Sequence, residues 1–287
     1  MRLVTYQSDH GPRVAAVGRH GLVDLNRADN ALPSCSKQLL ANWAELKPRA
    51  EAALESGVGG VRESILLLPP ILDPGKVIGV GLNYTDHARE TKMTPPDKPV
   101  IFCKFPTAVR ADGDPIVLPR ISQEVDFEAE LVVVIGQGGR HIRRARALEH
   151  VAAYACGNDV SARDWQHRTP GGQWLLGKSF DSFAPIGPAL VTADEIAEPG
   201  NLDIQLRLNG RTMQHSNTSQ LIFSVDFLIE YVSAVCTLSP GDLIFTGTPA
   251  GVGCARKPPV FLKPGDTVEV EIGQLGILTN PVVAEEK

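Results

Sequence analysis

The stretch EVDFEAELVVVIG, residues 124–136, constrains the fold of this chain more than any other stretch. Its apolar run predicts a buried β-strand. Side chains alternate between the two faces of a strand, so Asp126, Glu128 and Glu130 are expected on one face and the apolar residues between them on the other. Three carboxylates on one face of a half-buried strand need basic partners or a bound cation, because repulsion and desolvation are costly. The alternative is an edge strand whose carboxylates are solvated.

If a cation balances these carboxylates, oxygen ligands without a nearby His or Cys favour Mg²⁺ over Zn²⁺, with Mn²⁺ or Ca²⁺ as further options. A third ligand must come from elsewhere in the chain. The stretch GNDVSARDWQ offers Asp159 and Asp164 beside Arg163 and Gln166. The alternative interpretation is a turn capped by Asn158 and Asp159, with an exposed ion pair between Arg163 and Asp164.

Two further segments carry candidate catalytic groups. In GGQWLLGKSFD, Lys178 lies between apolar residues, so it is either an acid–base group or substrate anchor, or simply a solvated lysine. In GLNYTDHARE, His87 and Glu90 are three residues apart, on one side of a helical turn if the segment is helical. Contact with Glu90 would set the imidazole tautomer of His87. The alternative is an exposed pair without a catalytic role.

The stretch TGTPAGVG, residues 246–253, follows a predicted strand and is rich in Gly and Thr. This composition is typical of a loop that presents backbone N–H groups and hydroxyls to an anion. The lysine of a Walker P-loop is missing, so nucleotide binding is not expected.

Composition excludes several classes of function. The chain has 28 Lys and Arg against 33 Asp and Glu, a net charge of −5, which gives no electrostatic footprint for nucleic acid or an anionic membrane. The N-terminal segment has no apolar core of a signal peptide, and no apolar run approaches the length of a membrane span, so we expect a soluble, cytoplasmic protein. The five cysteines form no CxxC pair and are interpreted as reduced thiols: Cys35, Cys103, Cys156, Cys236 and Cys254.

The chain as a whole predicts an α+β fold. Strand-like runs dominate from residue 77 onward, and only ARALEHVAAYA and FSVDFLIEYVSAVC have clear helical patterns there. Strands and helices do not alternate along the chain, so the pattern does not predict a doubly wound fold. Short strands and the helical stretch SKQLLANWAELKPRAEAALES predict a small α+β N-terminal domain over residues 1–70, and the proline-rich LLPPILDPGK predicts a linker to a catalytic domain over residues 71–287.

The order and wording of the motifs between Asp73 and Val283 resemble the fumarylacetoacetate hydrolase family. The resemblance rests on VGLNYTDHARE, VDFEAELVVVIG, GNDVSARDWQ, LLGKSFDSFAPIGP, LRLNGRTMQ, LIFTGTPAGVG and FLKPGDTVEVEI. Within the family, the phrases SQEVDFEAEL, ARDWQ, QWLLGKSFD and RKPPVFLKPGD are most similar to the branch called fumarylacetoacetate hydrolase domain-containing protein 2. The resemblance implies a mixed β-sheet rolled on itself, a small N-terminal domain, a homodimer and a site for Mg²⁺ or Mn²⁺.

The resemblance also implies roles for individual residues. Metal ligands fall on Glu128, Glu130 and Asp159, while Asp126 lies beside them without being a ligand. Lys178 matches the active-site lysine of the family. Three residues match positions that hold a substrate carboxylate: Arg163, Gln166 and Thr248. His87 and Glu90 match a pair that relatives place on a lid, where hydrolysing members use it to activate water.

This set of residues suits a small 2-oxo acid that binds a metal through its carboxylate and C2 oxygen and reacts through an enolate. We expect an oxaloacetate keto–enol tautomerase, an activity associated with the branch named above, because it needs only proton transfers that Lys178 and the pair His87–Glu90 can supply. The alternatives are an acylpyruvate hydrolase or an oxaloacetate decarboxylase on the same site. A more distant alternative is an inactive binding protein, which the intact Glu128, Glu130, Asp159 and Lys178 argue against. The expected partner is the small-molecule substrate, with no nucleic acid and no membrane.

Overall fold

The computed structural model describes residues 1–61, 65–92 and 94–286. Over these residues a 12-stranded sheet runs in the order β4-β3-β2-β1-β14-β12-β11-β17-β6-β7, with β5 paired to β1 and β8 to β14. The sheet is mixed, because β17 and β6 are parallel while β11 and β12 are antiparallel. Its strands are β1 Arg2–Ser8, β2 Gly11–Gly18, β3 Gly21–Asp24, β4 Gly60–Val61, β5 Leu67–Leu68, β6 Val77–Gly81, β7 Val100–Lys104, β8 Val109–Arg110, β11 Ala129–Ile135, β12 Val151–Asn158, β14 Ala184–Thr192 and β17 Leu243–Phe245.

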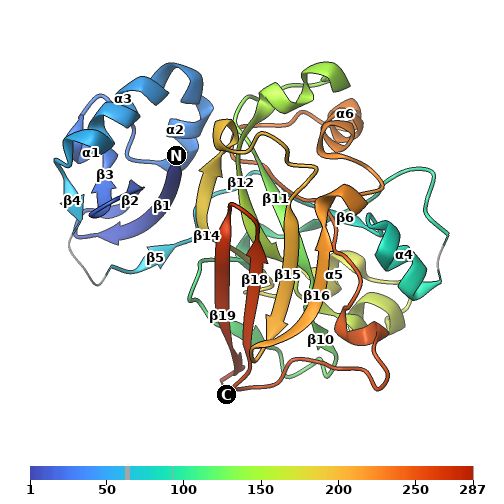
Figure 1. The fold of residues 1–287 in the computed structure, drawn as a ribbon. Helices are drawn as coiled ribbons and strands as arrows, with labels where there is room; N and C mark the ends of the chain where they lie inside the picture. Colours follow the sequence, from blue (N-terminus) through green and yellow to red (C-terminus); the bar gives the residue numbers. More distant parts are fainter. Residues whose placement is uncertain (62–64, 93, 287) are drawn as a thin grey trace.

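A five-stranded sheet in the order β16-β15-β18-β19-β9 packs against β11, β12 and β14 of the large sheet (Figure 1). Its strands are β9 Ile116–Leu118, β15 Asp203–Leu208, β16 Arg211–Asn217, β18 Thr267–Ile272 and β19 Gly276–Ala284. A short third sheet pairs β10 Val125–Asp126 with β13 Ser161–Ala162. Together with the helices, these layers confirm the α+β fold with a mixed sheet rolled on itself.

The N-terminal part of the chain forms a compact unit at one side of the molecule (Figure 1). Strands β1 to β4 form a meander, and the predicted helical stretch folds as α2 Ser36–Ala41 and α3 Trp43–Ser56, after the short α1 Leu25–Ala28. Gly57 caps the C-terminus of helix α3, and its left-handed φ of 65° suits the residue without a Cβ. Strand β1 pairs with β14 through Leu3 and Leu190, so this unit extends the large sheet. The boundary at residue 70 stays a prediction.

One predicted helix is wrong. In ARALEHVAAYA the first part is a 3-10 helix, Arg144–His150, but the chain then enters β12. Every residue of β12 is buried, so it is apolar on both faces and its sequence lacks the alternation that marks a half-exposed strand. The other helical prediction is confirmed by α6 Val225–Val235. Two shorter α-helices of this part are α4 Thr85–Thr91 and α5 Trp174–Lys178.

The core centres on β11 and β12, whose residues are all buried. Burial on both faces excludes the solvated edge strand as an interpretation of residues 129–135. No helix in the described ranges is long and apolar enough to cross a membrane. All five cysteines are free thiols, as expected.

Candidate active site

The acidic stretch of the sequence is not one continuous strand, and this prediction is wrong. Strand β10 ends at Asp126 and β11 begins at Ala129, so the chain breaks between them. Side chains take over the backbone hydrogen bonds at the break. The N–H of Phe127 donates to Oδ1 of Asp126 at 2.8 Å, and the N–H of Glu128 donates to Oδ1 of Asn158 at 3.0 Å. The break brings the carboxylates into the interior at the end of the sheet.

Three of the predicted acidic residues meet in one cluster. Glu128, Glu130 and Asp159 each offer a carboxylate oxygen, and these oxygens lie within 4.8 Å of one another. All three side chains are buried. Asp159 follows β12 directly, and its N–H donates to the carbonyl of Glu128 at 2.9 Å, which fixes the two segments side by side. Three buried carboxylates with oxygen donors alone fit a hard divalent cation.

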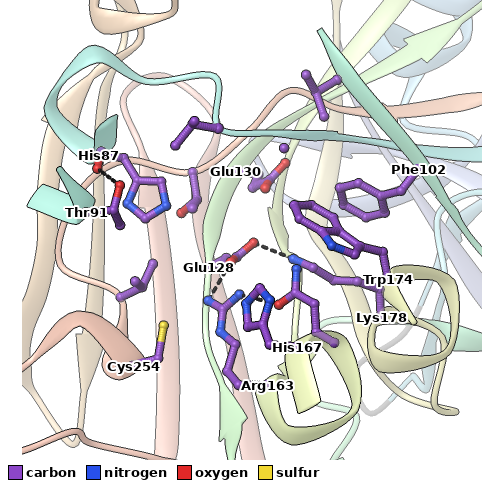
Figure 2. Close-up of a pocket in the computed structure, with 16 residues that line it drawn as sticks. His87, Thr91, Phe102, Glu128, Glu130, Arg163, His167, Trp174, Lys178 and Cys254 are labelled. Atoms are coloured by element: carbon purple, nitrogen blue, oxygen red, sulfur yellow. Dashed lines mark hydrogen bonds and ion pairs between the residues drawn. The ribbon is translucent and has the colours of Figure 1, made fainter. Parts of the chain in front are cut away.

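Lys178 lies inside this cluster, so the solvated alternative is excluded. Its Nζ donates to Oε2 of Glu128 at 2.7 Å (Figure 2). It also donates to Oδ2 of Asp159, likewise at 2.7 Å. Burial lowers the pKa of Lys178, but Asp159 and Glu128 outweigh burial and raise this pKa above its usual value. The side chain is therefore an ammonium group held between two candidate ligands.

Arg163 is buried and pairs with Asp126 and Glu128, so the alternative interpretation, an exposed ion pair with Asp164, is excluded. The guanidinium donates through Nε to Oδ2 of Asp126 at 2.9 Å, through Nη2 to Oε1 of Glu128 at 2.6 Å and through Nη1 to Oε1 of Gln166 at 2.9 Å. Asp164 instead accepts from the hydroxyl of Ser122 at 2.7 Å. Burial raises the pKa of Glu128, but Lys178 and then Arg163 lower it to about 2.

A buried lysine that the sequence analysis missed contacts the same cluster. Lys104, at the end of β7, donates to Oδ1 of Asp159 and to the carbonyl of Val160, the latter at 3.1 Å. Burial lowers the pKa of Lys104 to about 8, against the opposing effect of Asp159. Lys104 shares a strand face with Phe102, so the two-residue alternation of PVIFCKF is a signal that could have placed it inside.

Glu130 differs from its neighbours, because its hydrogen-bond donor is a backbone group. The N–H of Gly247 donates to Oε2 of Glu130 at 2.7 Å. Burial, followed by repulsion from Asp159 and Glu128, raises the pKa of Glu130 well above its usual value. A divalent cation at the cluster would supply the positive charge that this carboxylate lacks.

The loop of residues 246–253 does present backbone N–H groups to anions, but these anions are carboxylates of the protein itself. Besides Gly247, the N–H of Gly251 donates to both carboxylate oxygens of Glu90 at 3.0 Å. The N–H of Gly253 donates to Oδ1 of Asp126 at 2.7 Å. The loop thus connects the acidic cluster to helix α4.

His87 and Glu90 are both on α4, as the predicted helical turn requires. Nδ1 of His87 lies 3.4 Å from Oε2 of Glu90, and the two side chains are 13% and 25% exposed. Burial raises the pKa of Glu90, but contact with His87 and the N–H of Gly251 lowers it below its usual value. A hydrogen-bonded carboxylate and imidazole is an arrangement that can accept a proton.

One cavity of ≈ 150 Å³ brings most of these groups together (Figure 2). Seven predicted site residues line it: His87, Glu128, Glu130, Arg163, Gln166, Lys178 and Thr248. Asp159 and Glu90 lie behind the lining, in contact with residues that form it. The aromatic side of the cavity was not predicted from the sequence; it is formed by Phe102, His167 and Trp174. In Figure 2 the rings of Phe102 and Trp174 lie on the side away from His87.

The charges around the cavity do not balance on their own. Four buried carboxylates, those of Asp126, Glu128, Glu130 and Asp159, face the cations Lys104, Lys178 and Arg163. With every group ionised the net charge is negative, and one divalent cation makes it positive. A loaded site of this composition would attract a small anion.

The comparison with protein families decides the relationship of this chain. The model described as fumarylacetoacetate hydrolase C-terminal matches residues 76–283. The chain belongs to the fumarylacetoacetate hydrolase family. The curated relatives include oxaloacetate tautomerase fahd2, mitochondrial, of Xenopus laevis, which is 48% identical over 99% of this chain and 90% of the relative. Oxaloacetate tautomerase FAHD2A, mitochondrial, of Homo sapiens is 46% identical over 99% of this chain and 92% of the relative.

Solved structures of family members have the same fold. Fumarylacetoacetate hydrolase from Exiguobacterium antarcticum has a TM-score of 0.86 and 34% identity, covering 99% of this chain and 100% of the other. Maleylpyruvate hydrolase from a Sphingobium species, in complex with manganese(II) and pyruvate, has a TM-score of 0.83 and 31% identity, covering 100% of both chains. The predicted family and fold are therefore confirmed.

The names of the relatives also test two other predictions. They agree with the expected oxaloacetate tautomerase. The expected cytoplasmic location is wrong, because these relatives are named as mitochondrial proteins. Net charge and an N-terminal segment without an apolar core do not distinguish the cytoplasm from an organelle.

Proposed function

We propose that this protein is an oxaloacetate keto–enol tautomerase that uses one divalent cation, Mg²⁺ or Mn²⁺. The observation that carries the proposal is the placement of the Lys178 ammonium between Glu128 and Asp159, in the same small cavity as Glu130. The names of the curated relatives support the substrate. The manganese complex of the related maleylpyruvate hydrolase supports the cation.

Glu128, Glu130 and Asp159 would hold the cation. A bound divalent cation would supply Lewis-acid stabilisation of the negative charge that develops on the C2 oxygen of a 2-oxo acid. The side chains around the cation site would bind the substrate carboxylate, remove the proton of the enol hydroxyl and deliver a proton to C3.

The groups for substrate binding are Arg163, Gln166 and Thr248. A guanidinium has five N–H groups, and three of those of Arg163 bind within the protein, so two remain for a carboxylate. The hydroxyl of Thr248 accepts from Gln214 at 2.8 Å, which leaves its own O–H free to donate into the cavity.

The proton transfers fall to Lys178 and to the pair His87–Glu90. Lys178 has an ammonium N–H that neither Glu128 nor Asp159 occupies, and the side chain lines the cavity, so it can protonate C3. His87, with Glu90 behind it, can accept the proton of the enol hydroxyl. The two transfers leave the carbon skeleton unchanged and consume no net proton.

The pair His87–Glu90 also favours the second candidate, acylpyruvate hydrolysis, because a base in the cavity can activate water. Oxaloacetate decarboxylation would use the same residues. The names of the relatives favour the tautomerase. An inactive binding protein is disfavoured by the buried charges, which cost stability unless they serve a ligand.

The test follows enol-oxaloacetate by its absorbance while the products are analysed, with Mg²⁺ and with EDTA. We expect fast ketonisation with little pyruvate, acetate or oxalate formed, loss of the acceleration in EDTA, and poor cleavage of acetylpyruvate. Fast acetylpyruvate cleavage without faster ketonisation would leave the hydrolase as the function. The predicted homodimer stays a proposal, which light scattering on the purified protein would test.

A further inference from the structure

Lys104 is one of two lysines whose ammonium groups hold Asp159. Its side chain is fully buried, and Nζ contacts Oδ1 of Asp159 while Lys178 donates to Oδ2. Lys104 comes from β7, and Lys178 from α5. Lysines from two separate elements therefore bind the two carboxylate oxygens of Asp159, a candidate metal ligand.

Lys104 has no route to the substrate. It is not among the residues that line the cavity, and its second acceptor is the carbonyl of Val160, at 3.1 Å. Within the described residues, its one ion pair is with Asp159. A buried charge with this single partner is costly to desolvate, so its presence needs a reason connected with Asp159.

We propose that Lys104 is a positioning residue that fixes the carboxylate of Asp159 for cation binding. This inference rests on the proposed cation site. A carboxylate turns readily about its last side-chain bond, and Lys178 alone constrains one of its oxygens. Lys104 constrains the other oxygen and, through Val160, the backbone that follows Asp159. Losing a hydrogen-bond partner of a metal ligand typically weakens metal binding by about 10–100-fold.

The positive charge of Lys104 would affect cation binding in the direction opposite to positioning of Asp159. An ammonium group near a divalent cation repels it, so Lys104 acting through charge alone would weaken cation binding. Positioning predicts that removal of Lys104 weakens binding of the cation, whereas charge alone predicts that removal strengthens it. The sign of the change therefore distinguishes the two.

The experiment compares Lys104→Met with Lys76→Met. Nζ of Lys76 lies 2.7 Å from Oδ2 of Asp242, whose side chain is fully buried, so this control also removes an ammonium group from a buried aspartate. Mn²⁺ binding to the metal-free proteins is measured by electron paramagnetic resonance without substrate. We expect Lys104→Met to bind Mn²⁺ about 10–100-fold more weakly, and Lys76→Met to bind it like wild type.

Turnover of oxaloacetate by the Lys104 variants is a second test of the positioning role. At saturating Mn²⁺, Lys104→Met should regain most of its turnover, with an unchanged KM for oxaloacetate, because Lys104 does not reach the cavity. If Lys104→Met does not fold, Lys104→Gln carries the test, because its uncharged amide fills the buried site while its side chain is one bond too short to hold both Asp159 and Val160 as Lys104 does. For Lys104→Gln we expect Mn²⁺ binding that is weaker than wild type.

Unchanged or tighter Mn²⁺ binding by a folded Lys104→Met or Lys104→Gln protein would overturn the positioning role. This outcome is distinct from failure of the proposed function. A wild-type protein that binds Mn²⁺ without accelerating oxaloacetate ketonisation would refute the tautomerase alone.

Discussion

The backbone N–H of Gly247 donates a hydrogen bond of 2.7 Å to Oε2 of Glu130. In the part of the chain that the structure describes, no lysine or arginine pairs with Glu130, whereas Glu128 pairs with Arg163 and Lys178. Glu130 is therefore the carboxylate of the cluster that most lacks a positive charge. This difference between two neighbouring glutamates leads to a test of the cation site.

We expect Glu130→Gln and Glu128→Gln to behave differently. The neutral amide that replaces the carboxylate in Glu130→Gln can still accept from Gly247, so this variant should leave the stability of the metal-free protein nearly unchanged while weakening Mn²⁺ binding by more than about 100-fold. Glu128→Gln removes the partner of two buried cations and should lower the free energy of unfolding by on the order of 3 kcal/mol. Urea unfolding and Mn²⁺ titration measure the two effects. Wild-type Mn²⁺ affinity in Glu130→Gln would exclude Glu130 as a ligand.

Gly247 itself supports a second test. Its φ is +103°, and a Cβ there would lie 2.7 Å from Cβ of Asn83. Gly247→Ala should therefore displace the N–H from Glu130, destabilise the protein by more than about 1 kcal/mol and weaken Mn²⁺ binding. The control is Gly210→Ala, at a φ of +74° with no atom within 4 Å of the added Cβ. This control has backbone strain alone and should bind Mn²⁺ normally; equal losses in both variants would contradict the role of Gly247.

Lys178→Met tests the proton donor. The substitution keeps much of the side-chain length but removes the ammonium group between Glu128 and Asp159. At saturating Mn²⁺ we expect turnover of enol-oxaloacetate to fall by about 10²–10⁴-fold, the usual contribution of general acid–base catalysis. The saturating metal separates this loss from weaker metal binding. Wild-type turnover in a folded Lys178→Met protein would rule out the catalytic role.

Trp174 limits the cavity on its aromatic side. A Cβ on Gly81 would lie 2.7 Å from the Trp174 ring, so the missing side chain of Gly81 makes room for this ring against β6. We expect Trp174→Ala to enlarge the cavity and to raise the ratio of kcat/KM for acylpyruvates with longer chains to that for oxaloacetate, by about 10-fold or more per added methylene accommodated. Trp43→Ala, on α3 outside the cavity, is the control. An unchanged ratio in Trp174→Ala would show that the ring does not set substrate size.

A buried carboxylate in the N-terminal unit gives a prediction for pH. Asp24 accepts from the hydroxyl of Tyr6 at 2.6 Å, from Nη2 of Arg13 at 3.0 Å and from the N–H of Arg27 at 2.9 Å. Burial raises the pKa of Asp24, but these donors outweigh burial and hold the pKa below its usual value. A carboxyl with a lower pKa in the folded state stabilises the fold above its unfolded pKa of about 3.9, and this stabilisation is lost as the pH falls through the folded pKa.

We therefore expect Asp24→Asn to be clearly less stable than wild type at pH 7, with the difference shrinking as the pH falls below about 4. Urea unfolding at pH 7 and pH 3 measures it. Asp29→Asn is the control, because Asp29 pairs with Arg49 at the surface and should affect stability much less. A wild-type minus Asp24→Asn difference that is equal at both pH values would contradict the assignment.

Strands that are buried on one face only could be predicted from the sequence, because their apolar and polar residues alternate. Alternation in DTVEVEIG and LDIQLRLNG corresponds to β18 and β15, which are buried on one face only. The same argument failed at β12, where burial on both faces removed the alternation. It also failed at Phe127, whose backbone N–H donates to a side-chain oxygen of Asp126 instead of to a neighbouring strand.

The sequence by itself determined the family, through collinear motifs, and it identified the acidic stretch that needs positive charge. Only the tertiary structure decided which charges meet. Lys104 and Asp159 are 55 positions apart, and Gly247 and Glu130 are 117 apart, yet each pair is in contact. Such contacts depend on strand order and on the direction in which each buried side chain points. Neither can be read from the local sequence, because a lysine that becomes buried can have the same kinds of sequence neighbours as an exposed one. Its burial depends on how the sheets pack together.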